Sequence, residues 1–244
     1  MSWHDRLRIV LIEPRNPLNI GAAARAMFNF GFSELWLVDP YHKAFREARS
    51  AVGAAEVLER ARVTSDRAEA LGGASLIAGT STLHGRADDM VQRELSSGAL
   101  AVRTHLDDRR AALVFGSEKF GLSREDLSFC DWVTNIPTRD RCPSMNLGQA
   151  VAVCCYEIAQ RARVVPELST PASAGAEERD RILGLLMPLL EQSGFVHESG
   201  RATQQLKLRR FVSRLRLAPD DARLMQGMLR QIQWKLGHPG TREP

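Results

Sequence analysis

Three short segments carry residues that could do chemistry, and each follows a run that predicts a buried strand. The first, Asn16 to Met27, contains a proline, a predicted helix N-terminus and several very small side chains. Small residues let another group approach the backbone closely, and a helix N-terminus favours an anion. Arg25 falls nearly two turns after Asn19 in this segment. By its spacing alone, Arg25 fits a surface arginine on a packing helix as well as it fits a ligand contact.

The second segment is the glycine-rich stretch from Phe115 to Leu122. It resembles half of a phosphate-binding P-loop, but Leu122 stands where that motif requires lysine, which excludes nucleotide hydrolysis of that type. The remaining interpretation is a glycine-rich loop at the carboxyl edge of a parallel sheet, where ligands commonly bind. Glu118 is its carboxylate, although taken singly it is better explained as a solvated loop residue.

The third segment, Pro143 to Ala150, begins a predicted helix after the last strand. Ser144 and Asn146 can cap this helix or direct their polar groups into an adjoining pocket, and capping alone would explain Asn146. The helix is apolar on most sides from Leu147 to Cys155, which is more than one sheet face requires. The additional apolar surface of this helix predicts a subunit interface.

The elements that position these segments are predicted from apolar runs that alternate with helical periodicity. The runs are continuously apolar, as in strands buried on both faces of a mostly parallel sheet, so an α/β fold follows. Asn19 is the expected N-cap of a helix that ends at about Phe30 before Gly31, and another helix is expected from Asn146. The five predicted strands are Arg8 to Ile12, Leu35 to Val38, Ser75 to Ala78, Ala112 to Phe115 and Trp132 to Ile136.

The C-terminal third has a different composition. Residues 1–163 form the predicted α/β domain, residues 164–176 a linker rich in proline and small residues, and residues 177–244 an all-helical extension. Its predicted helices are Glu177 to Ser193, Ala202 to Arg216 and Pro219 to Leu236. The stretch from Arg201 to Arg216, which includes the second of these helices, has six basic residues and no acidic one. Its face of Lys207, Arg210 and Arg214 suits an RNA phosphate backbone, and the alternative is a merely solvated face.

Other functions fail their sequence tests. The chain has no dinucleotide-binding glycine motif, serine-hydrolase elbow or zinc-protease motif, and its six histidines are scattered. The four cysteines lack zinc or disulfide spacing and are expected to act as small apolar residues. No apolar stretch approaches the roughly 20 residues of a membrane span. We therefore expect a cytoplasmic protein with no metal and no membrane contact.

Taken together, the three segments resemble in residues, order and spacing the motifs of the SPOUT class of RNA methyltransferases, in the branch that methylates ribose 2′-hydroxyls. Within that branch the sequence is similar to the bacterial tRNA (cytidine/uridine-32-2′-O)-methyltransferases. Three C-terminal stretches look like that family's helical extension, so the resemblance covers nearly the whole chain: Gly194 to Val196, Lys207 to Phe211 and Leu229 to Gln233. Met145 and Gly148 depart mildly from the Leu and Ala that close relatives favour.

The resemblance implies a sheet with a deep trefoil knot in its C-terminal part, a homodimer with active sites at the subunit interface, S-adenosylmethionine as cofactor and tRNA as substrate. Its cofactor loops correspond to Gly79, Thr80, Ser81, Gly116, Ile136, Pro143, Ser144 and Met145. Its characteristic polar residues correspond to Asn19, Arg25, Glu118, Ser144 and Asn146.

Arg25 stands at the position of the family's catalytic arginine. A guanidinium with a pKa above roughly 12 hardly releases its proton in a protein. Our hypothesis is that Arg25 grips a substrate phosphate and stabilises the developing alkoxide, while Ser144 and Asn146 shape the pocket. The alternatives are the same chemistry on ribosomal RNA and a non-catalytic RNA-binding protein with this fold; an unrelated nucleotide-binding enzyme fits least.

Overall fold

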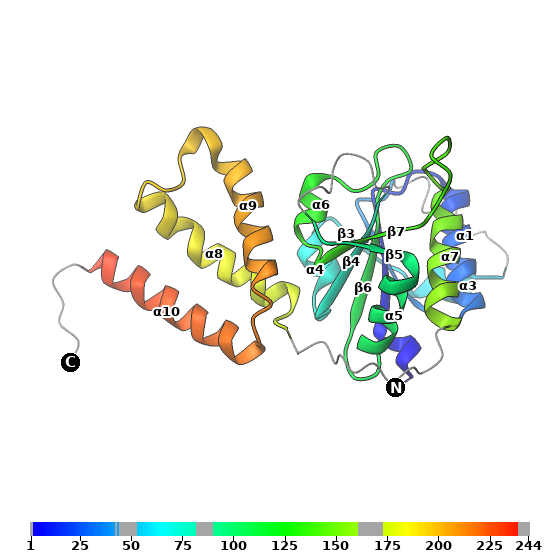
Figure 1. Ribbon diagram of the computed structural model, residues 1–244, viewed down its shortest axis with the longest axis horizontal. Helices are drawn as coiled ribbons and strands as arrows, with labels where there is room; N and C mark the ends of the chain where they lie inside the picture. The colour runs from blue at the N-terminus through cyan, green and yellow to red at the C-terminus, as the bar shows by residue number, and fades with distance from the viewer. Residues whose placement is uncertain (1, 42, 44–52, 82–89, 161–172, 239–244) are drawn as a thin grey trace.

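A seven-stranded parallel sheet forms the centre of the computed structural model, which describes residues 2–41, 43, 53–81, 90–160 and 173–238 (Figure 1). The strand order is β3-β2-β1-β6-β4-β7-β5. The strands are β1 (Leu7–Ile12), β2 (Glu34–Val38), β3 (Arg62–Thr64), β4 (Leu76–Thr80), β5 (Gln92–Glu94), β6 (Ala111–Phe115) and β7 (Trp132–Asn135). The predicted α/β class is confirmed.

All five predicted strands are present, within a residue or two of the predicted bounds. Sequence reasoning missed β3 and β5, which are three residues long and mostly exposed at the two edges of the sheet. A short edge strand lacks the continuous apolar run that marks a strand buried on both faces. Its position is set by pairing with its neighbour, here Arg62 beside Trp36 and Arg93 beside Thr134.

Helices cover both faces of the sheet, and alternate residues of each strand point to opposite faces. Ile9 and Leu11 of β1 belong to the core under one helical layer, whereas Val10 and Ile12 belong to the core under the other. The first layer contains α1 (Pro17–Asn29), α3 (Ala55–Arg60), α5 (Leu95–His105) and α7 (Leu147–Gln160). The second contains α4 (Arg67–Leu71) and α6 (Arg124–Ser128).

The start of α1 corrects one prediction. The N-cap is Asn16, whose side chain accepts a hydrogen bond from the Leu18 amide at 2.9 Å, and Pro17 occupies the first helical position. Asn19 is therefore inside the helix, and its side chain is available for another partner. The predicted end is confirmed, because Gly31 follows the helix with a φ of 82°.

The cysteine prediction holds for three of the four thiols. Cys130, Cys154 and Cys155 are buried, whereas Cys142 is exposed in the loop before α7. All four are free thiols. In the described parts of the chain no cluster of potential metal ligands occurs, and no described helix has the length and apolar character to cross a membrane.

The C-terminal helices form a separate layer against α4 and α6 (Figure 1). They are α8 (Ala176–Gln192), α9 (Arg201–Arg214) and α10 (Pro219–Gly237), close to the predicted bounds, and two 3-10 turns, Trp3–Arg6 and Glu198–Gly200, complete the elements. Most of the predicted linker lies outside the described residues, so the domain division stays a prediction. The trefoil knot also stays a prediction, since strand order alone does not establish one.

A buried ion pair holds the extension to the α/β part. Arg179 of α8 and Asp131, just before β7, are 2.7 Å apart, and their side chains are 9% and 7% exposed. The other oxygen of Asp131 accepts the amide of Ile77 at 2.8 Å. Nearby, the hydroxyl of Ser173 donates to the carbonyl of Ser75 at 3.0 Å. These contacts fix where α8 leaves the sheet.

Replacement of Arg179 by methionine should destabilise the protein strongly, because it leaves the Asp131 charge buried without its partner. We expect a loss of about 3–5 kcal/mol, measured by thermal or denaturant unfolding. Arg181→Met is the matched control, since its pair with Glu177 is exposed and should contribute less than about 1 kcal/mol. Equal stability of the two variants would contradict a stabilising role of the buried pair of Arg179 and Asp131.

Candidate active site

A cleft of about 360 Å³ opens at the carboxyl ends of β4, β6 and β7. Three loops wall it: the residues that end β4, the glycine-rich segment after β6, and the segment between β7 and α7. In parallel sheets this edge is where ligands bind. Seven of the eight predicted cofactor residues line the cleft: Thr80, Ser81, Gly116, Ile136, Pro143, Ser144 and Met145.

The glycine-rich loop is a tight turn closed by its own backbone. Ser117 and Gly121 pair as an antiparallel bridge, in which the Gly121 amide donates to the Ser117 carbonyl at 2.8 Å. A Cβ on Gly116 would lie 1.9 Å from the carbonyl carbon of Gly121. Gly121 itself has a φ of 66°. The turn therefore requires glycine at both positions, for space at the first and for conformation at the second.

Gly116→Ala should open this turn. The added methyl meets backbone, which cannot rotate away, so we expect a destabilisation of about 1–3 kcal/mol and a loss of ligand affinity in the cleft. Thermal unfolding and S-adenosylmethionine titration would measure the two effects. The control is Gly184→Ala in α8, where a Cβ meets nothing within 4 Å. This substitution should increase the free energy of unfolding by at most about 1 kcal/mol. An unchanged G116A protein would refute the close contact.

Hydrogen bonds tie the end of β4 to its neighbours on both sides. The hydroxyl of Thr80 donates to the Val114 carbonyl at 3.0 Å, and the amide of Ser81 donates to the Thr134 carbonyl at 3.1 Å. The side-chain amide of Asn135 donates to the Ser81 carbonyl at 3.2 Å. This wall of the cleft is consequently a rigid continuation of the sheet.

Gly79 is the one predicted cofactor residue that does not line the cleft. It is one residue earlier in β4, where a Cβ would lie 2.9 Å from the Cys130 sulfur and 3.0 Å from Leu122. Gly79 thus lets buried side chains pack under the cleft. Its contribution to ligand binding would be indirect.

The third wall is the loop from Ile136 to Asn146. The hydroxyl of Thr138 donates to the Pro143 carbonyl at 3.1 Å and so draws the two ends of the loop together. Ser144 is exposed, lines the cleft, and makes no side-chain hydrogen bond within the described residues. Its hydroxyl is therefore available to a ligand.

Three polar side chains that the sequence places far apart are connected by hydrogen bonds. The side-chain amide nitrogen of Asn146 donates to the side-chain oxygen of Asn19 at 2.8 Å. The side-chain amide nitrogen of Asn19 in turn donates to the Glu118 carboxylate at 3.0 Å. Asn146 also caps α7, because its oxygen accepts the Gln149 amide at 3.3 Å. Asn146 is therefore the cap that the sequence predicted, while its bond to Asn19 joins it to the polar residues behind the cleft, whose lining does not include it.

The Glu118 carboxylate is occupied by donors from the loop before α1. It accepts the backbone amides of Arg15 at 3.2 Å and Asn16 at 3.1 Å, in addition to Asn19. Partial burial alone would raise the pKa of Glu118, but these hydrogen bonds outweigh burial and lower the pKa below its usual value. Glu118 therefore stays ionised at neutral pH, and it holds the glycine-rich loop to the start of α1.

Glu118→Gln tests this electrostatic role through its pH dependence. A depressed pKa means that the carboxylate stabilises the folded state above its unfolded pKa, and that this stability is lost as the pH falls through the folded value. The melting temperature of the variant should be lower than that of the wild type at pH 7.5, and the gap should narrow below about pH 4.5. The exposed Glu59→Gln is the control; a gap independent of pH would exclude the charge as the cause.

The close approach of α1 and α7 brings Asn19 to Asn146. A Cβ on Gly148 would be 2.6 Å from the Cβ of Ala22, so the two helices touch backbone to small side chain. Gly148, a mild departure from the family pattern, therefore permits this contact. It sets the separation that the bond between the two asparagines needs.

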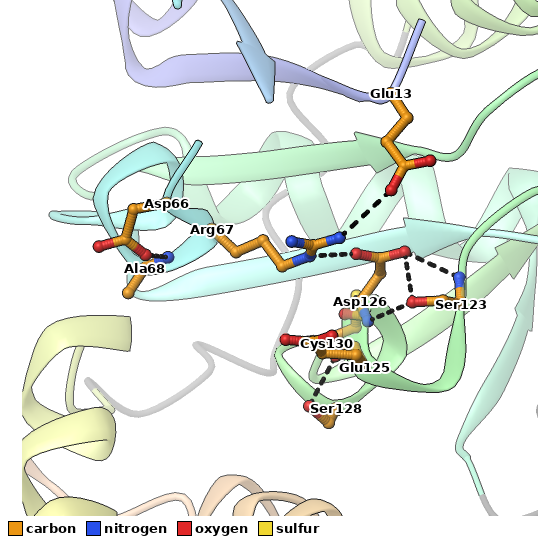
Figure 2. A network of polar contacts seen from close by, with 9 residues as sticks. All are labelled: Glu13, Asp66, Arg67, Ala68, Ser123, Glu125, Asp126, Ser128 and Cys130. Atoms are coloured by element: carbon orange, nitrogen blue, oxygen red, sulfur yellow. Dashed lines mark hydrogen bonds and ion pairs between the residues drawn. The ribbon is translucent and has the colours of Figure 1, made fainter. Parts of the chain in front are cut away.

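A second polar network joins the segment after β1 to the residues that follow the glycine-rich loop (Figure 2). Arg67 of α4 donates to Asp126 at 2.6 Å and lies 3.7 Å from Glu13, which follows β1. Asp126 also caps α6 with Ser123, one residue after the glycine-rich loop ends. The glycine-rich loop is therefore held at two points, in its middle through Glu118 and just after its end through Asp126.

Arg25 does not line the cleft. It is exposed on α1 and has no hydrogen bond or ion pair within the described residues. Large apolar side chains are also exposed on these helices: Leu18 (78%) and Phe28 (50%) on α1 and Tyr156 (50%) on α7. Of the predicted polar residues, Glu118 and Ser144 line the cleft, Asn19 and Asn146 are joined to Glu118 by hydrogen bonds behind it, and Arg25 is outside it.

The predicted RNA-binding face of α9 is on the outer surface. Lys207 and Arg214 are exposed, and Arg210 is half-buried. Phe211 of the same helix is 46% exposed, whereas Val212 packs inward between the C-terminal helices. Arg209 faces the core as well, paired with Asp180 and 4.0 Å from the Phe129 ring.

Comparison with known proteins places this geometry in a family. The model of the SpoU rRNA Methylase family matches residues 6–156. The chain belongs to this family. The match ends within α7, so it spans all three walls of the cleft and confirms the methyltransferase class predicted from the three segments.

The similarity to individual relatives extends over the C-terminal helices too. The tRNA (cytidine/uridine-2'-O-)-methyltransferase TrmJ of Escherichia coli (strain K12) is 34% identical over 241 residues, covering 94% of this chain and 96% of the relative. That of Cronobacter sakazakii (strain ATCC BAA-894) is 33% identical over the same shares. The crystal structure of TrmJ from Z. mobilis ZM4 has a TM-score of 0.80 at 27% identity and covers 93% of this chain and 98% of that one.

Sequence reasoning missed several residues that line the cleft: Ser117, Lys119, Phe120, Thr134, Asn135 and Thr138. The first three are inside the segment that it singled out, but only the turn geometry decides which of them face the cleft. Thr134 and Asn135 end the predicted strand β7, and their position after a buried strand was a usable signal. Thr138 carried no signal, because its bond to Pro143 closes the loop only in three dimensions.

Proposed function

We propose that this protein is an S-adenosylmethionine-dependent methyltransferase that acts on a ribose 2′-hydroxyl of tRNA, at cytidine or uridine 32. The observation that carries the proposal is a cleft that the second and third motif segments line and to which hydrogen bonds of Asn19 join the first. The chain is also similar over nearly its whole length to proteins named tRNA (cytidine/uridine-2'-O-)-methyltransferase. A cytoplasmic location is the natural setting for such a substrate.

The cleft suits the cofactor in size and lining. Ligand pockets for molecules of this kind occupy about 300–1,000 Å³, and the cleft falls in that range. Its glycine-rich turn leaves no room for a side chain at Gly116, so the backbone can lie directly against a flat ligand. Thr80, Ile136 and Met145 would hold the cofactor from the other two walls. When bound, S-adenosylmethionine supplies a methyl group activated by a sulfonium.

The chain's own contribution is to position and stabilise rather than to accept a proton. The Glu118 carboxylate already accepts hydrogen bonds from Asn19 and two backbone amides, and the described residues that line the cleft include no histidine. Ser144 and Asn146 would orient the ribose hydroxyl beside the cofactor. Arg25 would bind a substrate phosphate and stabilise the alkoxide as the proton leaves to solvent.

We further propose a homodimer in which Arg25 completes the cleft of the partner subunit. Arg25 is outside its own chain's cleft, and the packed helices α1 and α7 expose Leu18, Phe28 and Tyr156 as well. Exposed large apolar side chains on one pair of helices are typical of a subunit interface. The predicted second use of the apolar helix α7 agrees with this surface.

The C-terminal extension would bind the body of the tRNA. The exposed Lys207 and Arg214 provide sequence-independent phosphate contacts along α9. Methylation of ribosomal RNA is the second candidate, favoured only by the name of the matching family. Mapping of 2′-O-methyl groups in tRNA and ribosomal RNA from a deletion strain, with and without the gene restored, decides between them.

Substitution of Arg25 tests catalysis. Arg25→Ala should lower kcat for methylation by about 10²–10³-fold, while the melting temperature stays unchanged because the side chain is exposed. Arg25→Lys should recover only part of the rate, since lysine lacks the planar pair of donors. Transfer of a labelled methyl group to tRNA is the measurement. Near-full activity of Arg25→Lys would contradict the bidentate contact, and an inactive wild type that still binds RNA would favour the non-catalytic alternative.

A further inference from the structure

The loop between β7 and α7 carries charges that the fold does not use. Arg139, Asp140 and Arg141 are at its tip, and all three are exposed. The amide of Cys142 donates to the Arg139 carbonyl at 2.8 Å, so the tip is a closed turn rather than an open strand of chain. Together with the Thr138 bond to Pro143, this turn presents the tip beside the cleft.

Three arginines of the protein show what a structural partner looks like. Arg8 pairs with Glu34, Arg67 with Asp126, and Arg179 with Asp131, each with a largely buried guanidinium. Arg139 and Arg141 form no ion pair with any residue in the described ranges. These two exposed guanidiniums are separated by one residue and have no acidic partner, so stabilisation of the fold does not account for them.

The opposite wall of the cleft offers a third cation. Lys119 is exposed on the glycine-rich turn, and its ammonium is 5.0 Å from the centre of the Phe120 ring. Both residues line the cleft. The acidic side chain in that lining, Glu118, is turned toward the amides of Arg15 and Asn16. The mouth of the cleft is therefore flanked by positive charge on two sides.

We propose that Arg139 and Arg141, opposed by Lys119, bind phosphates of the RNA strand on either side of the ribose that enters the cleft. The inference rests on the proposed RNA methyltransferase function and adds the residues that hold the substrate strand at the reacting end. Arginine forks match phosphate oxygens in pairs, and a lysine acts as a point charge. The contacts recognise the backbone and not the base.

The arrangement assigns separate tasks to two basic surfaces. The face of α9 would hold the body of the RNA, while the loop tip would act within a few residues of Ser144 and Asn146. Loss of the tip should therefore raise KM for RNA and leave both kcat at saturation and the affinity for S-adenosylmethionine nearly unchanged.

The decisive variant is Arg139→Ala/Arg141→Ala in the full-length chain. We expect KM for unmodified tRNA transcript to rise about tenfold or more, and the slope of log Kd against log salt concentration to fall by about 2. The matched control, Arg60→Ala/Arg181→Ala, removes the same charge from two exposed i,i+4 ion pairs on α3 and α8. The control should shift neither quantity by more than twofold.

Asp140→Asn gives a prediction of opposite sign. Removal of this carboxylate makes the tip more positive, so KM for tRNA should fall about two- to threefold and the salt slope should steepen. The same substitution would have no such effect if the tip did not face the RNA.

The outcomes separate this inference from the function on which it rests. A wild type that transfers no methyl group to tRNA contradicts the function. An active wild type whose Arg139→Ala/Arg141→Ala variant keeps its KM and salt slope overturns the inference alone. Parallel losses of RNA and S-adenosylmethionine affinity in that variant would also overturn it, because they would mean that the loop had lost its shape.

Discussion

The hydrogen bonds that join Asn146, Asn19 and Glu118 are the constraint on which the rest of the site depends. They connect the first turn of α1 to the glycine-rich loop, 99 residues away in the chain, and to the start of α7, 127 residues away. Because the carboxylate also accepts two backbone amides, it fixes a whole loop and not one side chain. The walls of the cleft are held at set distances before any ligand arrives, which reduces the cost of ordering them on binding.

The two faces of the sheet have different uses. One face carries α4 and α6, and against it the C-terminal helices are held by the buried pair of Arg179 and Asp131. The other face carries α1 and α7, whose outer surfaces expose Arg25 among apolar side chains. A second subunit can approach this face without displacing the extension. The layering in Figure 1 thus lets one small domain support both a proposed dimer and a proposed RNA-binding arm.

The site contains polar groups but no described residue suited to take up a proton at neutral pH. Its carboxylate is held ionised by hydrogen bonds, and the other polar side chains that line the cleft are an amide, hydroxyls and one ammonium. Such a set can orient reactants and stabilise negative charge. This is what transfer of an already activated methyl group requires, because the leaving sulfur needs no protonation. The chemistry proposed from family resemblance and the electrostatics of the cleft are therefore consistent.

The sequence by itself determined the five central strands, the helices α1, α7, α8, α9 and α10, and the identity of the three motif segments. Strands buried on both faces give continuous apolar runs, and caps and glycine stops are local signals. Only the tertiary structure decided how polar residues are paired. Asn19 looked like a helix cap, but Asn16 takes that position and frees Asn19 to bond Glu118. Likewise the outward direction of Arg25 and the packing of Gly79 beneath the cleft depend on neighbours distant in sequence. Hydrogen-bond partners a hundred residues apart leave no local pattern, because their meeting is decided by the order of strands and the closeness of two helices.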